Sequence, residues 1–129
     1  MSVAVICTAL LALLIFGLGL AVSTARGSTR TIVGYAAADP ADRLHKLVRA
    51  HGNATEYVPI MAVLILYVGS RGPSTWMVWT FVVATVARYL HAAGMVVGPR
   101  LDQPHTLRFI GAVGTYLAGF ALVVATLVV

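Results

Sequence analysis

The chain has 129 residues, of which 60% are hydrophobic and only 10% charged, and its formal net charge at pH 7 is +5. This composition excludes an ordinary soluble domain and predicts an integral membrane protein. The basic residues gather near the ends of apolar stretches and form no patch with interleaved aromatic residues, so no nucleic-acid partner is expected.

Four stretches are long and apolar enough to cross a bilayer, and little chain remains for a domain outside it. We therefore predict an all-α membrane protein, with residues 1–129 forming a single four-helix transmembrane domain. The helices are expected at residues 3–24, 40–70, 73–97 and 105–129.

The first stretch is predicted to be a membrane helix and not a cleaved signal peptide. No Lys or Arg precedes it, and its apolar run is longer than the hydrophobic region of a signal peptide. Cys7 is the single cysteine and lies inside this run, so no internal disulfide can form and the thiol is expected to pack as a small hydrophobic group.

The distribution of basic residues predicts the orientation in the membrane. The second connection holds only Arg71, whereas the first and third connections are flanked by seven basic residues: Arg26, Arg30, Arg43, Lys46, Arg49, Arg100 and Arg108. Since short loops rich in Lys and Arg stay in the cytoplasm, both termini are expected outside the cell.

The second stretch is longer than a membrane requires. Asp39-Pro40 suits an N-cap followed by proline at the first helical position, so this helix is expected to begin there. It would be about 45 Å long against a hydrocarbon core of about 30 Å, so its first turns stand in the cytoplasm. Pro59 removes the backbone hydrogen bond to the carbonyl of Thr55 and predicts a bend beside Glu56.

The fourth stretch carries small residues at a regular interval. Gly111, Thr115 and Gly119 follow one another at four-residue spacing, which places them on one face of a helix. Such a stripe is typical of close packing between membrane helices.

Polar residues of all four stretches reach the same membrane leaflet. Arg49, Asn53, Glu56 and Tyr57 lie at helical spacing where the second stretch turns apolar, and Arg26, Arg88, His91 and Arg108 come from the other three. Counted from the outer helix ends, Glu56 and Arg88 each lie about 9 Å inside the hydrocarbon, which allows an ion pair. An ionised side chain at that depth costs about 2.5 to 3.5 kcal/mol, so it faces protein or a watery cavity.

Two interpretations of these polar residues stay open. They could form a binding site, or Arg49, Asn53 and Glu56 could pair with Arg88 only to fix the register of the helices. His91 could likewise act as a base or pack without a chemical role. No metal site is predicted, because the four histidines have no carboxylate or cysteine at ligand spacing. No Ser or Cys nucleophile lies near a base, so any nucleophile must come from a second molecule.

The motifs RAHGNATEYVP, TWM and ARYLHAAG resemble those of the MAPEG family, the membrane-associated proteins of eicosanoid and glutathione metabolism. The resemblance is closest to the small bacterial YecN-like branch, covers all four helices and is most specific in the second and third. It implies a four-helix protomer in the bacterial inner membrane, assembled as a homotrimer. It also implies glutathione as a cosubstrate, bound between neighbouring subunits toward the cytoplasmic side.

Matched position by position, the resemblance implies a set of glutathione-binding residues: Arg49, Asn53, Glu56, Tyr57, Arg88, His91 and, more weakly, Arg26. Glutathione carries two carboxylates that suit guanidinium groups and an ammonium that suits Glu56. The resemblance also implies that Arg108 stabilises the thiolate and acts as the catalytic residue, with Arg100 as the second choice. A nearby guanidinium lowers the pKa of a thiol from about 8.5 and makes the sulfur nucleophilic.

The sequence departs from the eukaryotic pattern of the family at Met95. A tyrosine is expected there, one turn after the histidine position, and no phenol replaces it nearby in the chain. The eicosanoid substrates of the family are therefore not expected. His51 also stands where a relative has glutamine, and it can still donate a hydrogen bond.

The expected function is that of a glutathione-dependent membrane transferase or peroxidase that conjugates or reduces a lipophilic electrophile. The first alternative is a non-catalytic membrane module that binds an anionic small molecule or a lipid headgroup. The second alternative is a structural membrane protein that binds no such ligand.

Overall fold

The computed structural model describes residues 2–34 and 39–129. These residues form a bundle of four helices: α1 (Val3–Thr29), α2 (Arg43–Gly69), α3 (Thr75–Val97) and α4 (Thr106–Val128). Each is long and apolar enough to cross a membrane. The predicted all-α architecture with four membrane helices is therefore confirmed.

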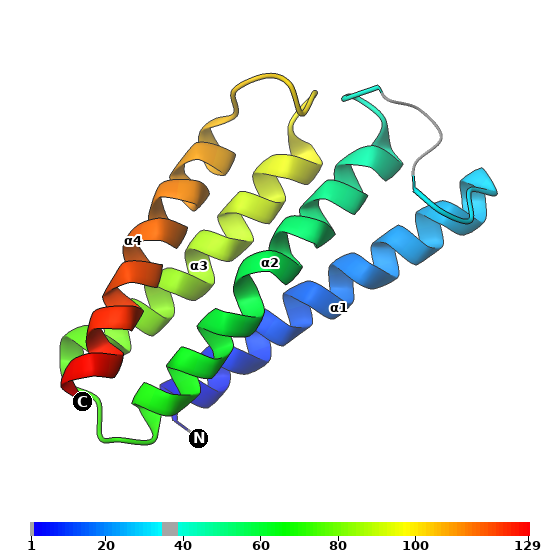
Figure 1. Cartoon of the computed structure of the whole chain (residues 1–129). Coiled ribbons are helices and arrows are strands. Elements are labelled where there is room, and N and C mark those ends of the chain that lie inside the picture. Colours follow the sequence, from blue (N-terminus) through cyan, green and yellow to red (C-terminus); the bar gives the residue numbers. More distant parts are fainter. Residues whose placement is uncertain (1, 35–38) are drawn as a thin grey trace.

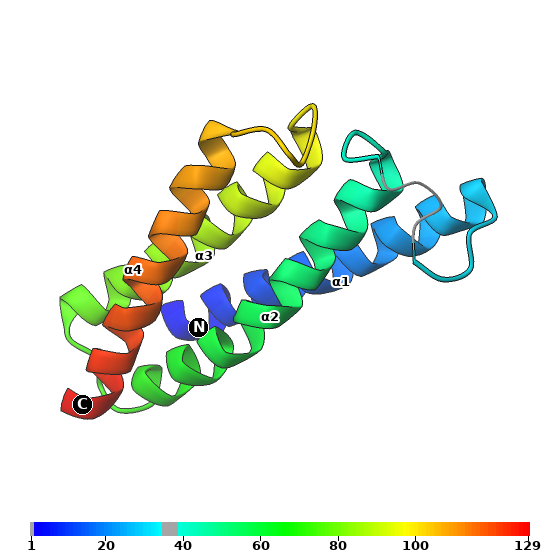
Figure 2. The same cartoon turned by 45° about the horizontal axis from the view of Figure 1, so that its top comes forward.

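The helices run alternately in opposite directions, so both termini and the α2–α3 turn lie at one end of the bundle (Figure 1). The α1–α2 and α3–α4 connections lie at the other end, which we call the loop end. In the turned view, α1 packs along α2 and α4 packs along α3 (Figure 2). Large apolar side chains such as Phe16, Leu117 and Phe120 are exposed on the outside, as is expected of surfaces that face lipid.

The expected start of the second helix at Asp39-Pro40 is wrong. Asp39 instead accepts a hydrogen bond from the Ala41 N–H at 2.9 Å and forms a local turn. Asp42 is the N-cap, because its carboxylate accepts the His45 N–H at 2.8 Å and α2 begins at Arg43. Both aspartates are competent caps, and the sequence alone does not show which one the chain uses.

The first helix is longer than expected, since it ends at Thr29 and not at residue 24. The hydroxyls of Ser28 and Thr29 both donate to the carbonyl of Ala25, which satisfies one of the acceptors that the last turn leaves free. Arg30 then adopts a left-handed conformation with φ of 54° and its N–H caps the carbonyl of Arg26.

Close contact between α3 and α4 determines where the polar residues lie. A Cβ added at Gly94 would collide with the backbone of Arg108, and one added at Gly111 would collide with the backbone of His91. A Cβ at Gly114 would lie 2.8 Å from the Cβ of Ala87. The two backbones therefore approach each other closely over two turns, as small residues allow in membrane bundles.

Candidate functional site

A buried arginine occupies the middle of α3. Arg88 is only 1% exposed, and its Nη2 donates to the side-chain oxygen of Asn53 at 2.7 Å and to the Asn53 carbonyl at 3.2 Å. Its Nη1 donates to the Thr115 hydroxyl at 3.3 Å. These acceptors are all neutral, and no carboxylate in the described part of the chain lies within 4.0 Å of its nitrogens. The buried charge thus has no opposite charge beside it.

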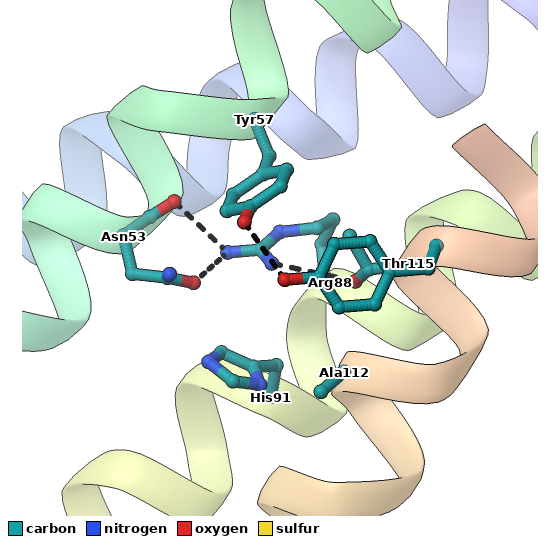
Figure 3. Close-up of a pocket in the computed structure, with 7 residues that line it drawn as sticks. Asn53, Tyr57, Arg88, His91, Ala112 and Thr115 are labelled. Carbon is teal, nitrogen blue, oxygen red and sulfur yellow. Dashed lines mark hydrogen bonds between the residues drawn. The ribbon is translucent and has the colours of Figure 1, made fainter. Parts of the chain in front are cut away.

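One tyrosine lies over this guanidinium, and a second tyrosine contacts the first. The Cζ atom of Arg88 lies 5.1 Å from the ring centroid of Tyr57, a distance typical of a cation–π contact. The hydroxyls of Tyr57 and Tyr116 lie 3.1 Å apart, and their rings meet edge to face with centroids 6.0 Å apart (Figure 3). Only one of the two hydroxyls donates in this contact, so the other retains a proton for a third group.

His91 lies one turn after Arg88 on α3 and points toward the same space (Figure 3). Its Nδ1 lies 3.0 Å from the carbonyl oxygen of Arg108 on α4. The close approach of Gly111 to the His91 backbone keeps the two helices near enough for this contact.

The polar side chains open onto three adjoining hollows. The polar hollow is lined by Asn53, Tyr57, Arg88, His91, Ala112, Thr115 and Tyr116, and its volume of about 20 Å³ holds about one water molecule. The apolar hollow, of about 190 Å³, shares Tyr57, Thr115 and Tyr116 with it and continues between α2 and α4 along Ile60, Leu64 and Phe120. The loop-end hollow, of about 310 Å³, shares His91 and Ala112 and contains Arg108 and His105.

The structure brings some of the expected site residues together and separates others. Asn53, Tyr57, Arg88 and His91 line the polar hollow. Arg49 and Glu56 are exposed on α2 and line none of the three hollows.

The ion pair allowed between Glu56 and Arg88 does not form. Asn53 and Tyr57 are four residues apart and share the α2 face that meets Arg88, whereas Glu56 lies on the flank of that face. Asn53 and Thr115 instead accept hydrogen bonds from the two terminal nitrogens of the guanidinium, and its Nε is buried with no partner among the described residues.

Arg26 lies on a different face of the bundle. It lines a hollow of about 470 Å³ together with Gly19, Ser23 and His51, and this hollow shares no residue with the polar hollow. Its Nη1 donates to the carbonyl of Ile32 at 3.0 Å, and its Nε is buried with no partner among the described residues. Within one protomer Arg26 therefore cannot act on a ligand at Arg88.

The two candidates for thiolate stabilisation lie at the loop end. The guanidinium of Arg108 donates to the carbonyls of Leu101 at 2.8 Å and Gln103 at 2.7 Å. Arg100 donates two hydrogen bonds of 3.0 Å to Asp102, and this contact raises the pKa of Arg100 and lowers the pKa of Asp102. Arg100 lines none of the three hollows, so Arg108 has the better position.

Sequence reasoning missed two residues of the site, Thr115 and Tyr116. Met95 is buried and lines none of the three hollows, whereas Tyr116 of α4 brings a phenol to the polar and apolar hollows. The available signal was that Tyr116 is the only strongly polar side chain beside Thr115 in the middle of an apolar helix. That signal does not give the direction in which the helix turns the side chain.

The fold and the polar cluster define a multi-pass membrane protein with a buried arginine beside a small polar hollow between its helices. The model of the MAPEG family matches residues 4–128, and the chain belongs to this family. Inner membrane protein YecN of Escherichia coli strain K12 and that of strain O6:H1 are each 42% identical to it over 52 residues. The match covers 40% of this chain and 40% of each relative. The resemblance read from the motifs, including the YecN-like branch, is confirmed.

Proposed function

We propose that the protein is a glutathione-dependent enzyme of the bacterial inner membrane, a transferase or peroxidase that acts on lipophilic electrophiles. The buried guanidinium of Arg88 carries this proposal, because it has only neutral acceptors around it. A buried charge without an opposite charge is costly, and an anionic ligand supplies what is missing. Either carboxylate of glutathione could do so, and family membership favours that ligand.

The apolar hollow supports a lipophilic second substrate. It adjoins the polar hollow at Tyr57 and Tyr116 and is otherwise lined almost entirely by apolar side chains. An electrophile that enters from the bilayer would meet a polar cosubstrate at this junction. The thiol sulfur of glutathione would then form a thioether with the electrophile as its leaving group and the thiol proton depart. With a hydroperoxide, two glutathione molecules would reduce it to an alcohol and water and become the disulfide.

The exposed charges of α2 support a homotrimer with glutathione between neighbouring subunits. Glu56 lies halfway along α2 and is exposed in the single protomer, where lipid would surround it. The polar hollow is also too small for a tripeptide, so the ligand lies over it and needs a second wall. A neighbouring subunit could provide this wall with its α1 face, which carries Arg26.

Arg108 is the proposed stabiliser of the thiolate. Two of the five N–H groups of its guanidinium donate to loop carbonyls, and the others remain for a sulfur anion. We place this site on the cytoplasmic side and both termini outside, because the basic residues gather at the loop end. The two relatives are described as inner membrane proteins, which agrees with that location.

A non-catalytic module that binds an anionic small molecule or a lipid headgroup is the second candidate. One observation favours it, namely that the guanidinium of Arg108 is already held by the carbonyls of Leu101 and Gln103. If those bonds persist when a ligand is bound, an anion is held at Arg88 and no thiol is activated.

Turnover by the purified protein separates the two candidates. Glutathione with an aryl chloride or a lipid hydroperoxide should give product, and Arg108→Ala should lower kcat at least about tenfold while binding changes less. Equal rates in the two proteins would remove Arg108 from the mechanism. Saturable glutathione binding without product from any electrophile would favour the binding module, and no glutathione binding at all would exclude the proposed enzyme.

A further inference from the structure

The contact between His91 and Arg108 determines which ring nitrogen carries the proton. The Arg108 carbonyl oxygen can only accept a hydrogen bond, so the Nδ1 of His91, at 3.0 Å, must be the donor. In the neutral ring the proton therefore stays on Nδ1, and Nε2 carries the lone pair.

The second ring nitrogen is accessible. Nε2 of His91 makes no hydrogen bond to residues 2–34 or 39–129, and it is not one of the buried polar atoms without a partner, so a ligand can reach it. In Figure 3 the ring points into the space beside Asn53 and Arg88. The ring cannot turn around without giving up the bond to α4, and α3 and α4 are held together there by Gly111 and Gly94.

We infer that His91 is the general base that takes the proton of the thiol cosubstrate, a role that rests on the proposed function. The S–H proton moves to Nε2, and the imidazolium formed keeps its Nδ1–H bond to the Arg108 carbonyl. With an aryl chloride, the thiolate then forms a C–S bond while the C–Cl bond breaks and chloride leaves. The imidazolium releases its proton to solvent, so the products are a thioether, chloride and one proton.

The backbone of Arg108 thus orients the base, while its side chain is available to the thiolate. Arg108 therefore has two separate roles in this inference, one for its carbonyl and one for its guanidinium. Replacement of the Arg108 side chain leaves the carbonyl in place, so the orientation of His91 is retained in Arg108→Ala.

Titratable and charged side chains from three helices and the loop before α4 surround His91. The titratable and charged side chains around the hollows it lines are Tyr57 on α2, Arg88 on α3, His105 before α4, and Arg108 and Tyr116 on α4. His105 is the one other histidine among these groups. His91 lines both the polar hollow, where the buried guanidinium lies, and the loop-end hollow.

Two substitutions test the lone pair of Nε2 separately from the hydrogen bond that Nδ1 donates. His91→Asn places an amide N–H near the position of Nδ1 and keeps a donor to the Arg108 carbonyl, but it has no nitrogen lone pair to accept a proton. His91→Gln places its amide near Nε2 and loses the donor. His45→Asn is the matched control, because Nδ1 of His45 also lies 3.0 Å from a backbone carbonyl, that of Asp39, away from the hollows.

The experiment measures glutathione affinity, the ultraviolet absorbance of bound thiolate and turnover of an aryl chloride in all four proteins. Wild type and His45→Asn should form thiolate at neutral pH. His91→Asn and His91→Gln should not, and their kcat should fall about 100-fold. Above the ordinary thiol pKa of about 8.5, solution deprotonates the sulfur, so the defect of His91→Asn should narrow to about threefold.

The outcomes distinguish this inference from the proposed function. Equal thiolate formation in wild type and His91→Asn would overturn the role of His91 while leaving the transferase intact. A defect in His91→Asn that stays constant across pH, or that appears only as weaker binding, would also overturn it. Thiolate formation that depends on His91 would support the base even if the aryl chloride gave no product.

Discussion

Arg88 and Arg71 make similar contacts in very different surroundings. Each guanidinium lies over a tyrosine ring, Arg88 at 5.1 Å from that of Tyr57 and Arg71 at 5.0 Å from that of Tyr67. Arg88 is buried in the middle of α3, whereas Arg71 is exposed at the α2–α3 turn. Only the buried guanidinium lies in a place where a missing opposite charge is costly.

This comparison gives a prediction at the scale of single residues. Arg88→Gln should weaken glutathione binding about 10- to 100-fold, because a hydrogen bond to a charged group contributes about 1.5 to 3 kcal/mol. Arg71→Gln is the control and should leave the affinity unchanged. Titration calorimetry in detergent measures both, and circular dichroism checks that each variant keeps its helices. An unchanged affinity in a folded Arg88→Gln protein would refute the assignment of the anion site.

The residues of the site were predictable from the sequence only in part. The depth of Asn53, Arg88 and His91 in the membrane follows from counting along the helices, and it places them in one leaflet. The depth does not fix which side chains point inward, and so Glu56 was wrongly allowed to pair with Arg88. Tyr116 was missed for the same reason, since its direction depends on how α4 is rotated against α3.

At the scale of helices, the crossing of α3 and α4 depends on glycine. Gly111→Ala would force a methyl group into the backbone of His91, so the helices must separate. We expect a loss of about 1 to 3 kcal/mol in stability, seen as a lower Tm in the same detergent. Gly52→Ala is the control, because a Cβ there meets nothing within 4 Å and should stabilise α2 by about 0.5 to 1 kcal/mol. Equal Tm values for the two variants would show that the crossing tolerates a wider spacing.

The connections at the loop end give a prediction about pH. Arg100 holds the pKa of the Asp102 carboxyl below its usual value. The contribution of this pair is therefore present above the unfolded carboxyl pKa of about 3.9 and is lost as pH falls through the lowered folded value. Both side chains are exposed, so the effect is small.

Hydrogen exchange of a single amide can detect this effect. The Leu101 N–H donates to the Pro40 carbonyl at 3.0 Å and joins the two connections at the loop end. Asp102→Asn should lower the protection of this amide at neutral pH, and the difference from wild type should close in acid. If the difference in protection persists below the folded pKa of Asp102, it has a cause other than the ion pair.

The helices themselves were predictable because hydrophobic length is a strong signal, whereas their ends were not. The start of α2 was expected at Asp39-Pro40 and is observed at Arg43, because Asp42 competes with Asp39 as a cap. The end of α1 lies beyond the expected residue 24, because the hydroxyls of Ser28 and Thr29 and the left-handed Arg30 cap the extra turn. Local hydrogen bonds that cost little to exchange decide such boundaries.

At the scale of the whole molecule, the single protomer leaves polar groups where lipid would surround them. Glu56 is exposed halfway along α2, and Arg26 lines a hollow that shares no residue with the polar hollow. A second copy that covers Glu56 and brings its own Arg26 would remove both difficulties. The cost of charge in the membrane thus supports the proposed assembly of several copies, independently of the chemistry at Arg88.

Glu56→Gln tests whether that carboxylate binds the ligand or only joins subunits. If Glu56 receives the ammonium of glutathione, the amide should weaken binding about tenfold or more, because the charge-assisted hydrogen bond is lost, while native mass spectrometry still shows a trimer. Asp102→Asn, outside the membrane, should change neither quantity. If the trimer dissociates and the remaining protein binds glutathione as tightly as before, Glu56 serves assembly alone, and a different group must receive the ammonium.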